Sequence, residues 1–158
     1  MLERNIQLIA ELNRNYNRIK DLYDWKIING KYEDSFHSPK EILLTFFRVW
    51  YELKENLKLE PWLSWYNWVV EKFCKNNDEI LLSIDIANYF KHWKLDRPKT
   101  NKIIWNINTQ LIIFDKYWKD RTNITIEIDW IKIDSIILTT NIIEKWNILI
   151  NNIKKDTQ

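Results

Sequence analysis

The sequence predicts an α+β fold in one domain: about four helices, then a small antiparallel sheet of about three strands, and a C-terminal helix. Apolar residues recur with helical period over residues 1–97, and β-branched residues partly alternate with polar ones over 103–133. Helical period returns over 135–153. The 158 residues are 46% hydrophobic, which is enough for one core, and no repeat or linker divides them.

The first helix is expected over residues 2–23. Its apolar stripe consists of Leu2, Ile6, Ile9, Leu12, Tyr16, Ile19 and Tyr23. Because the pattern covers only about three heptads, a helix that packs into the core is favoured over a helix that dimerises. The alternative is an oligomer formed through this helix. Residues 24–37 lose the period and predict a loop, with a turn at Asn29-Gly30 and a surface histidine, His37.

Two prolines mark the next helices. Ser38-Pro39-Lys40-Glu41 is a capping box, and the apolar residues after it cover much of the helix circumference, which predicts the central helix. Pro61 predicts the start of another helix with an aromatic face. The tryptophans at its start, Trp62, Trp65 and Trp68, could form a stacking platform, but at helical spacing a core role is favoured. Trp50, Trp65 and Trp146 are expected to be buried.

Asn77 predicts the cap of a fourth helix, which Pro98 ends. Its apolar face is expected to hold Ile80, Leu81, Ile84, Ala87 and Phe90. Residues 103–114 predict a strand, 119–123 a polar loop, and 124–128 a strand of period two. A turn at Asp129-Trp130 and a short strand over 131–133 complete the sheet. Asp134 caps the last helix, whose buried side is expected to hold Ile136, Ile137, Ile143, Trp146, Leu149, Ile150 and Ile153.

Composition excludes several classes of protein. The net charge of +2, from 24 basic and 22 acidic residues, produces no global field for nucleic acid or membrane. The single cysteine, Cys74, excludes an internal disulfide and a cysteine zinc site. The N-terminus has no signal-peptide core and no run is long enough to span a bilayer, so a cytoplasmic location is expected. One glycine and the absence of nucleotide or metal motifs predict no cofactor and no metal site.

The best place in the sequence for a polar site is the stretch from residue 85 to residue 98, which holds one of only two histidines and the densest run of positive charge. Asp85, Asn88 and His92 are three and four residues apart and therefore share one face of the fourth helix. An aspartate and an asparagine beside an imidazole could fix its tautomer for proton transfer near neutral pH. The alternative is a hydrogen-bonded seam that fastens the helix. The seam is favoured, because neither a nucleophile nor a second base is evident nearby in the sequence.

A basic and aromatic segment follows the candidate histidine. It consists of Lys91, Trp93, Lys94, Arg97, Lys99 and Lys102, with Phe90 beside it. Cations for phosphates and rings for bases are typical of a nucleic-acid contact, and the same residues could bind a partner protein. A solvated helix end, where cations favour the helix dipole, accounts for the charges equally well.

Two segments carry a resemblance to known proteins. Residues 50–55, Trp-Tyr-Glu-Leu-Lys-Glu, followed by residues 85–92, Asp-Ile-Ala-Asn-Tyr-Phe-Lys-His, resemble uncharacterised bacterial proteins in which an aromatic-x-Leu-Lys-acidic helix precedes an Ala-Asn-x-x-Lys-His helix. The helical arrangement with its late Asn/His face resembles the HEPN superfamily, which implies toxin–antitoxin or antiphage systems. HEPN ribonucleases carry an arginine four to six residues before a histidine. Neither His37 nor His92 has one, so the resemblance does not extend to that motif.

These observations favour a non-enzymatic intracellular interaction module, which the resemblance would place in a phage–host conflict system. Another protein is the expected partner, and nucleic acid would bind through residues 91–102. One alternative is a divergent HEPN-like ribonuclease that uses His92. Another is a small phage-type inhibitor that blocks a nuclease.

Overall fold

The computed structural model describes residues 3–24, 27–28, 31–32, 39–60, 67–92, 104–112, 121–128 and 131–155. Side chains are described over 3–21, 40–60, 68–89, 124–128 and 131–152. The architecture is α+β, as predicted. The helices of the described part are α1 (Glu3–Asp24), α2 (Pro39–Leu57), α3 (Asn67–Lys75), α4 (Asp78–His92) and α5 (Ser135–Lys155). None of these helices is both long enough and apolar enough to cross a bilayer.

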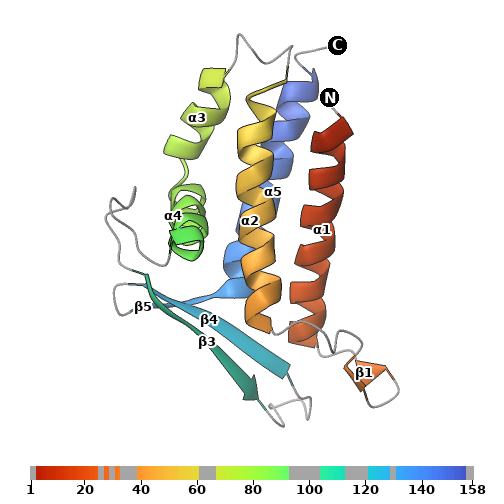
Figure 1. Ribbon diagram of the computed structural model, residues 1–158, viewed down its shortest axis with the longest axis vertical. Helices are drawn as coiled ribbons and strands as arrows, with labels where there is room; N and C mark the ends of the chain where they lie inside the picture. Colours follow the sequence, from red (N-terminus) through yellow and green to blue (C-terminus); the bar gives the residue numbers. More distant parts are fainter. Residues whose placement is uncertain are drawn as a thin grey trace.

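The helices stand side by side on a small sheet (Figure 1). Helix α2 lies in the middle, with α1 on one side, α3 and α4 on the other, and α5 behind. Helices α1 and α5 contact each other and strand β4 (Arg121–Ile128), so the sheet closes one end of the bundle. This arrangement places α2 between the other helices and explains why its sequence is apolar on most sides.

Helix α2 is the central helix that its capping box and apolar pattern predict. It begins at Pro39, while Ser38 lies outside the described residues. Its buried apolar side chains are Ile42, Leu43, Phe46, Phe47, Val49, Trp50, Leu53 and Leu57. The predicted burial of Trp50 and Trp146 is confirmed; their ring centroids are 5.8 Å apart at 61°. Trp65, predicted to be buried as well, lies outside the described residues.

The buried face of helix α1 overlaps with the predicted apolar stripe, through Leu12 and Ile19, but is shifted from it. The buried positions are Asn5, Leu8, Leu12, Asn15 and Ile19, which repeat at intervals of three and four. Ile6, expected in the stripe, is 57% exposed. Two asparagines, Asn5 and Asn15, belong to this buried face. The amide of Asn5 donates to the carboxylate of Glu60, and that of Asn15 donates to the carbonyl of Glu11 at 3.0 Å.

Helix α5 shows the same kind of shift. Trp146, Leu149 and Ile150 are buried as predicted, but Ile137 is 60% exposed. Leu138 and Ile142 are buried on the adjoining positions. Because isoleucines occupy almost every side of this helix, its sequence pattern does not define the centre of the buried face.

The main sheet is antiparallel, with strand order β3 (Ile104–Ile112), β4 and β5 (Ile131–Asp134). The predicted alternation in β4 is confirmed, because Ile124, Ile126 and Ile128 are buried between less buried neighbours. One expectation is wrong: residues 121–123, predicted as loop, are the first part of β4. They pair with residues 110–112 of β3. The hydrogen bonds between strands are made by the backbone, so polar residues can pair even where apolar and polar residues do not alternate.

A second, two-stranded sheet lies where only a loop was predicted. Strand β1 (Ile27–Ile28) pairs with β2 (Lys31–Tyr32), so the strand count exceeds the expected three. The Asn-Gly dipeptide between them is a strong hairpin signal. Strands of two residues are too short to show alternation, which is why the sequence pattern missed them.

The two described helix caps lie at the predicted residues, Asp134 and Asn77. They differ in that only Asp134 caps its helix through the side chain. The backbone N–H of Ile136 donates to Oδ1 of Asp134 at 2.9 Å, which is a side-chain N-cap of α5. Before α4, the carbonyl of Asn77 accepts from Leu81 at 2.9 Å. The side-chain amide of Asn77 donates back to the carbonyl of Phe73 at 2.7 Å, and so ties the end of α3 to the start of α4.

Candidate functional site

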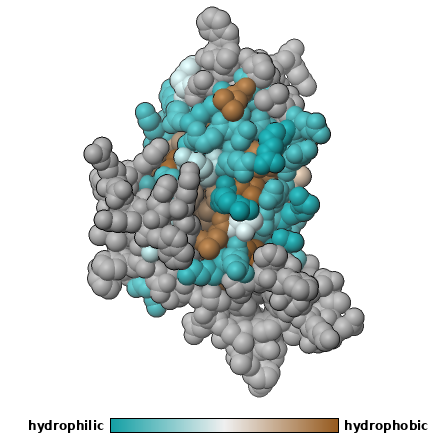
Figure 2. Space-filling view, in the orientation of Figure 1, coloured by the Kyte–Doolittle hydropathy of each residue, from teal (hydrophilic) through white to brown (hydrophobic). Residues whose placement is uncertain are grey.

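A cavity of about 530 Å³ lies between α2 and α4. Its described walls are Leu44, Thr45, Arg48, Tyr51, Glu52 and Glu55 of α2, and Ala87 and Asn88 of α4. Figure 2 shows hydrophobic residues exposed near the centre of this face of the molecule, bordered by hydrophilic ones. The volume lies within the range of ligand sites, roughly 300–1,000 Å³, and also suits a few side chains of a partner. We call this cavity the α2–α4 groove.

One stripe of α2 forms most of the groove. Leu44, Arg48, Tyr51 and Glu55 are three or four residues apart and therefore share a face. On one flank of this stripe Phe47, Trp50 and Lys54 are buried, whereas the stripe itself and its other flank, with Thr45 and Glu52, are exposed or half-buried. The groove wall is thus the accessible strip of the central helix.

Arg48 is the cation of this wall. It is exposed, and it has no hydrogen-bond or ion-pair partner among the described residues. Glu52, one turn further on, is already paired with Arg4 of α1. Within the described part of the chain, the donors of Arg48 are therefore available to an acceptor that enters the groove, such as a carboxylate or phosphate.

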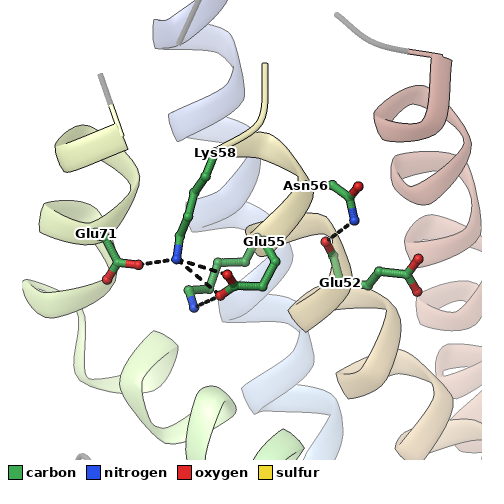
Figure 3. Close-up of polar contacts among 6 residues, drawn as sticks. Glu52, Glu55, Asn56, Lys58 and Glu71 are labelled. Carbon is green, nitrogen blue, oxygen red and sulfur yellow. Dashed lines mark hydrogen bonds and ion pairs between the residues drawn. The ribbon is translucent and has the colours of Figure 1, made fainter. Parts of the chain in front are cut away.

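A network of charges flanks the groove on the α3 side (Figure 3). Lys58 reaches from the end of α2 to both Glu55, at 3.2 Å, and Glu71 of α3. Lys54 also binds Glu55; its side chain is 3% exposed, and its Nζ lies 4.9 Å from the ring centroid of Tyr51. Two lysines thus fix the carboxylate of Glu55 at the edge of the groove.

The network shifts the ionisation of its members. Burial raises the pKa of Glu55, but the hydrogen bond and charge of Lys54, and then those of Lys58, outweigh it and hold the pKa below 4.5. Burial lowers the pKa of Lys58, but hydrogen bonds to Glu71 and Glu55 outweigh it and raise that pKa above 10.5. Both groups are therefore charged at neutral pH.

Helix α4 supplies the opposite wall. It also carries Asp85, Asn88 and His92, the polar ladder that was predicted to share one face of this helix. Asp85 is 1% exposed and lies in a run of five buried residues, 82–86. Asn88 is half-buried and lines the groove. His92 belongs to the last turn of α4, one turn after Asn88, and its side chain lies outside those described. The ladder thus begins in the core and reaches the groove at Asn88.

The other predicted binding residues fall largely outside the structure's description. Lys91 lies in α4 without a described side chain, and Trp93, Lys94, Arg97, Lys99 and Lys102 lie outside the described residues. Of the suggested tryptophan platform, only Trp68 is described; it is 58% exposed, with Nζ of Lys72 5.4 Å from its ring centroid. Among the described side chains, no group of three or more His, Cys, Asp or Glu is placed to hold a metal ion.

The two segments that carried the resemblance meet at the groove. Tyr51, Glu52 and Glu55 come from the first segment, and Ala87 and Asn88 come from the second. More than 30 residues separate them in the chain, and the packing of α4 against α2 brings them together. The sequence reading had not assigned Leu44, Thr45 or Arg48 to a site. The helical spacing of Leu44 and Arg48 from Tyr51 and Glu55, and of Thr45 from Arg48 and Glu52, is the signal that would have found them.

Comparisons of the chain with protein-family models, with curated proteins and with solved structures give no match.

Proposed function

We propose that the protein is a non-enzymatic interaction module whose α2–α4 groove receives a segment of a partner protein. One observation carries the proposal: two distant segments of the chain converge on the walls of a single groove. The groove combines apolar surface, from Leu44, Ala87 and the Tyr51 ring, with polar groups at its border. Partner segments bind in this way through apolar anchors and a few fixed polar contacts.

The chemistry of the described groups favours binding over turnover. A general base works best with a pKa near the operating pH, and the lysines hold the pKa of Glu55 in the opposite direction. Asp85 is enclosed in the core. Arg48 and the amide of Asn88 are binding groups, which donate hydrogen bonds without changing their protonation.

The biological setting of the proposal comes from the resemblance alone. It suggests a phage–host conflict system, in which the module would bind a toxin or an effector. A small phage-type inhibitor that blocks a nuclease would use the same kind of groove. A neighbouring nuclease or toxin gene would favour an inhibitor or antitoxin, whereas an isolated position in a defence locus would favour an effector.

Site-specific photocrosslinking tests the module. A photoreactive phenylalanine analogue replaces Thr45 in the groove wall, and the matched control carries it at Asn147, an exposed position of α5. In cells of the source organism, we expect one discrete protein adduct at residue 45 and none of the same mass at residue 147. Adding Arg48→Ala should reduce this adduct severalfold. The same adducts at both positions, or an RNA adduct at residue 45, would contradict the proposal.

One specific observation supports a second candidate, the divergent ribonuclease. Arg48 lines the groove together with Asn88, one helical turn before His92, so α2 could supply the arginine that the HEPN spacing lacks. A ribonuclease of this type predicts that the purified protein cleaves RNA without metal. His92→Ala and Arg48→Ala should then abolish cleavage with little change in melting temperature. If the seam is structural, His92→Ala lowers the melting temperature and there is no cleavage to lose.

The basic segment offers an independent test of nucleic-acid binding. If the cations of residues 91–102 contact phosphates, RNA or DNA affinity must fall steeply as salt rises, with a slope that reports the number of contacts. The module predicts binding that is absent, or weak and salt-sensitive. Fluorescence anisotropy with a labelled oligonucleotide at 50 and 200 mM salt measures it.

A further inference from the structure

The main sheet has two edges, and they are built differently. Strand β5 has four residues and includes the charged Lys132, which is exposed, and Asp134. Strand β3 has nine residues, and its sequence, Ile-Trp-Asn-Ile-Asn-Thr-Gln-Leu-Ile, contains no charge, proline or glycine. Among the described residues, β3 has a ladder partner only on its β4 side.

An edge strand exposes unpaired backbone N–H and C=O groups, and natural proteins protect such edges from pairing. Short length and charged residues are two of the usual protections, and β5 has both. On β3, the one register irregularity lies at its first residues, between Ile104 and Asn106. The following residues, 106–112, pair with β4 in continuous register and form a regular edge. Such an edge is suited to accept another strand.

The sequence of β3 is close to symmetric about Asn108. When the strand is laid antiparallel against a copy of itself with Asn108 at the centre, most of the facing residues are alike, and the exception is Ile107 opposite Thr109. The pairs are Ile104 with Ile112, Trp105 with Leu111, Asn106 with Gln110, Ile107 with Thr109, and Asn108 with itself. Amide groups both donate and accept hydrogen bonds, so an asparagine or glutamine can pair with its own kind.

We propose that β3 is a homodimer interface, in which two copies of the chain pair their β3 strands antiparallel about a two-fold axis at Asn108. The two three-stranded sheets then form one continuous sheet. A closed two-fold contact uses the same surface on both copies, so the surface must complement itself. A strand without charges and with a symmetric pattern meets this condition. A charged strand at the same edge would place like charges opposite each other.

The near-symmetric sequence of β3 also explains why a second copy of the chain, rather than an unrelated strand, pairs with its free edge. A partner strand of different sequence requires only an open edge and imposes no symmetry on β3. The near-symmetric pattern is accounted for by pairing with itself. Self-association uses the free edge of the sheet, and none of the residues that line the α2–α4 groove belongs to β3.

Cysteine crosslinking tests the register of the pairing. Residues facing each other across antiparallel strands have Cα atoms about 4.5–5.5 Å apart, within reach of a disulfide. Asn108→Cys should therefore form a disulfide-linked dimer on mild oxidation. In Asn106→Cys the two cysteines would be four residues out of register, roughly 13 Å along the strands, and should not crosslink. The double variant Asn106→Cys, Gln110→Cys should crosslink again. Cys74 is buried and is kept in all variants.

The mass of the native chain in solution tests the dimer itself. Light scattering at micromolar concentration should give twice the mass of one chain. Asn108→Lys places two ammonium groups opposite each other and should raise the dimer Kd at least ~10-fold, whereas Asn147→Lys on exposed α5 should leave it unchanged. A native monomer, or crosslinking of Asn106→Cys as efficient as that of Asn108→Cys, would overturn the proposal. Should Asn108→Lys fail to fold, the cysteine series still decides between the two outcomes.

Discussion

The two sides of α2 show how one helix can serve both as core and as site. On one side α1 packs along α2 and buries Leu8, Leu12 and Ile19. On the other side α4 leaves the groove, whose wall on α2 includes Leu44 and Tyr51. Both sides contain leucine and charged residues, so composition does not distinguish them.

The groove side differs from the packed side in one accessible cation, Arg48. Near α1 the amide of Asn5 donates to Glu60, and on the groove wall Glu52 is paired with Arg4 and Glu55 with Lys54. In the groove, Arg48 has no partner among the described residues. A polar group that is paired within the chain contributes to the fold, whereas an accessible donor such as Arg48 can bind a ligand. The predictions below test this difference between the packed side and the groove side.

The largest loss of stability is expected for the pair of tryptophans that joins α2 to α5, Trp50 and Trp146. Trp50→Ala or Trp146→Ala should cost about 3–5 kcal/mol of unfolding free energy, because each removes a fully buried indole and leaves a cavity. The two losses should not add, since the rings contact each other. Urea denaturation of both single variants and the double variant measures this. Trp68→Ala, at an exposed indole, is the control and should change stability by less than about 0.5 kcal/mol.

The stability losses caused by two leucine-to-alanine substitutions, one on each side of α2, compare the packing of the two sides directly. Leu12→Ala should cost about 2–5 kcal/mol, because it opens a closed cavity on the packed side. Leu44→Ala should cost only about 1 kcal/mol, because Leu44 is half-buried and its removal widens a groove that is already open. Equal losses in urea denaturation would mean that the groove side is packed as tightly as the other.

In the charge network beside the groove, the loss of stability should depend on whether Glu55 or Lys54 is replaced. Glu55→Gln leaves the ammonium of Lys54 buried without its counter-charge and should cost about 1–2 kcal/mol, a value reduced for the partial exposure of Glu55. Lys54→Met removes the buried charge but keeps the length of the side chain, and should cost less than about 1 kcal/mol. Thermal melts at neutral pH measure both. A larger loss for Lys54→Met would show that the ion pair itself stabilises the fold.

The smallest effect concerns the ion pair between α4 and α5. The hydrogen bond from Lys145 lowers the pKa of Glu79 below 4.5, assisted by a backbone hydrogen bond and opposed by burial. Because the folded-state pKa is depressed, the pair stabilises the fold above pH 4.5, and this stability is lost as pH falls through the lowered pKa. Lys145→Met should therefore cost up to about 1 kcal/mol at pH 7, discounted for exposure, and almost nothing near pH 2. A loss that does not depend on pH would contradict this account.

The local signals in the sequence were sufficient for most of the secondary structure of the described residues. Pro39, Asp134 and the alternating isoleucines of β4 each define an element within a few residues, because capping and strand alternation depend on near neighbours in the chain. The β1–β2 hairpin was missed for the same reason, since it is too short to carry a pattern. The candidate Asn88 was found on α4, but the sequence did not indicate what lies opposite it.

The sequence by itself thus determined the α+β class, the central place of α2 and the burial of Trp50 and Trp146. The tertiary structure alone decided where the buried faces of α1 and α5 are centred. Asn5 is buried while Ile6 is exposed, because burial on α1 depends on α2 and on Glu60, which is 55 residues away. It also decided that Arg48 and Asn88 share one groove. Helical periodicity shows that a helix has an apolar side, but only the packing of neighbouring helices determines which residues meet.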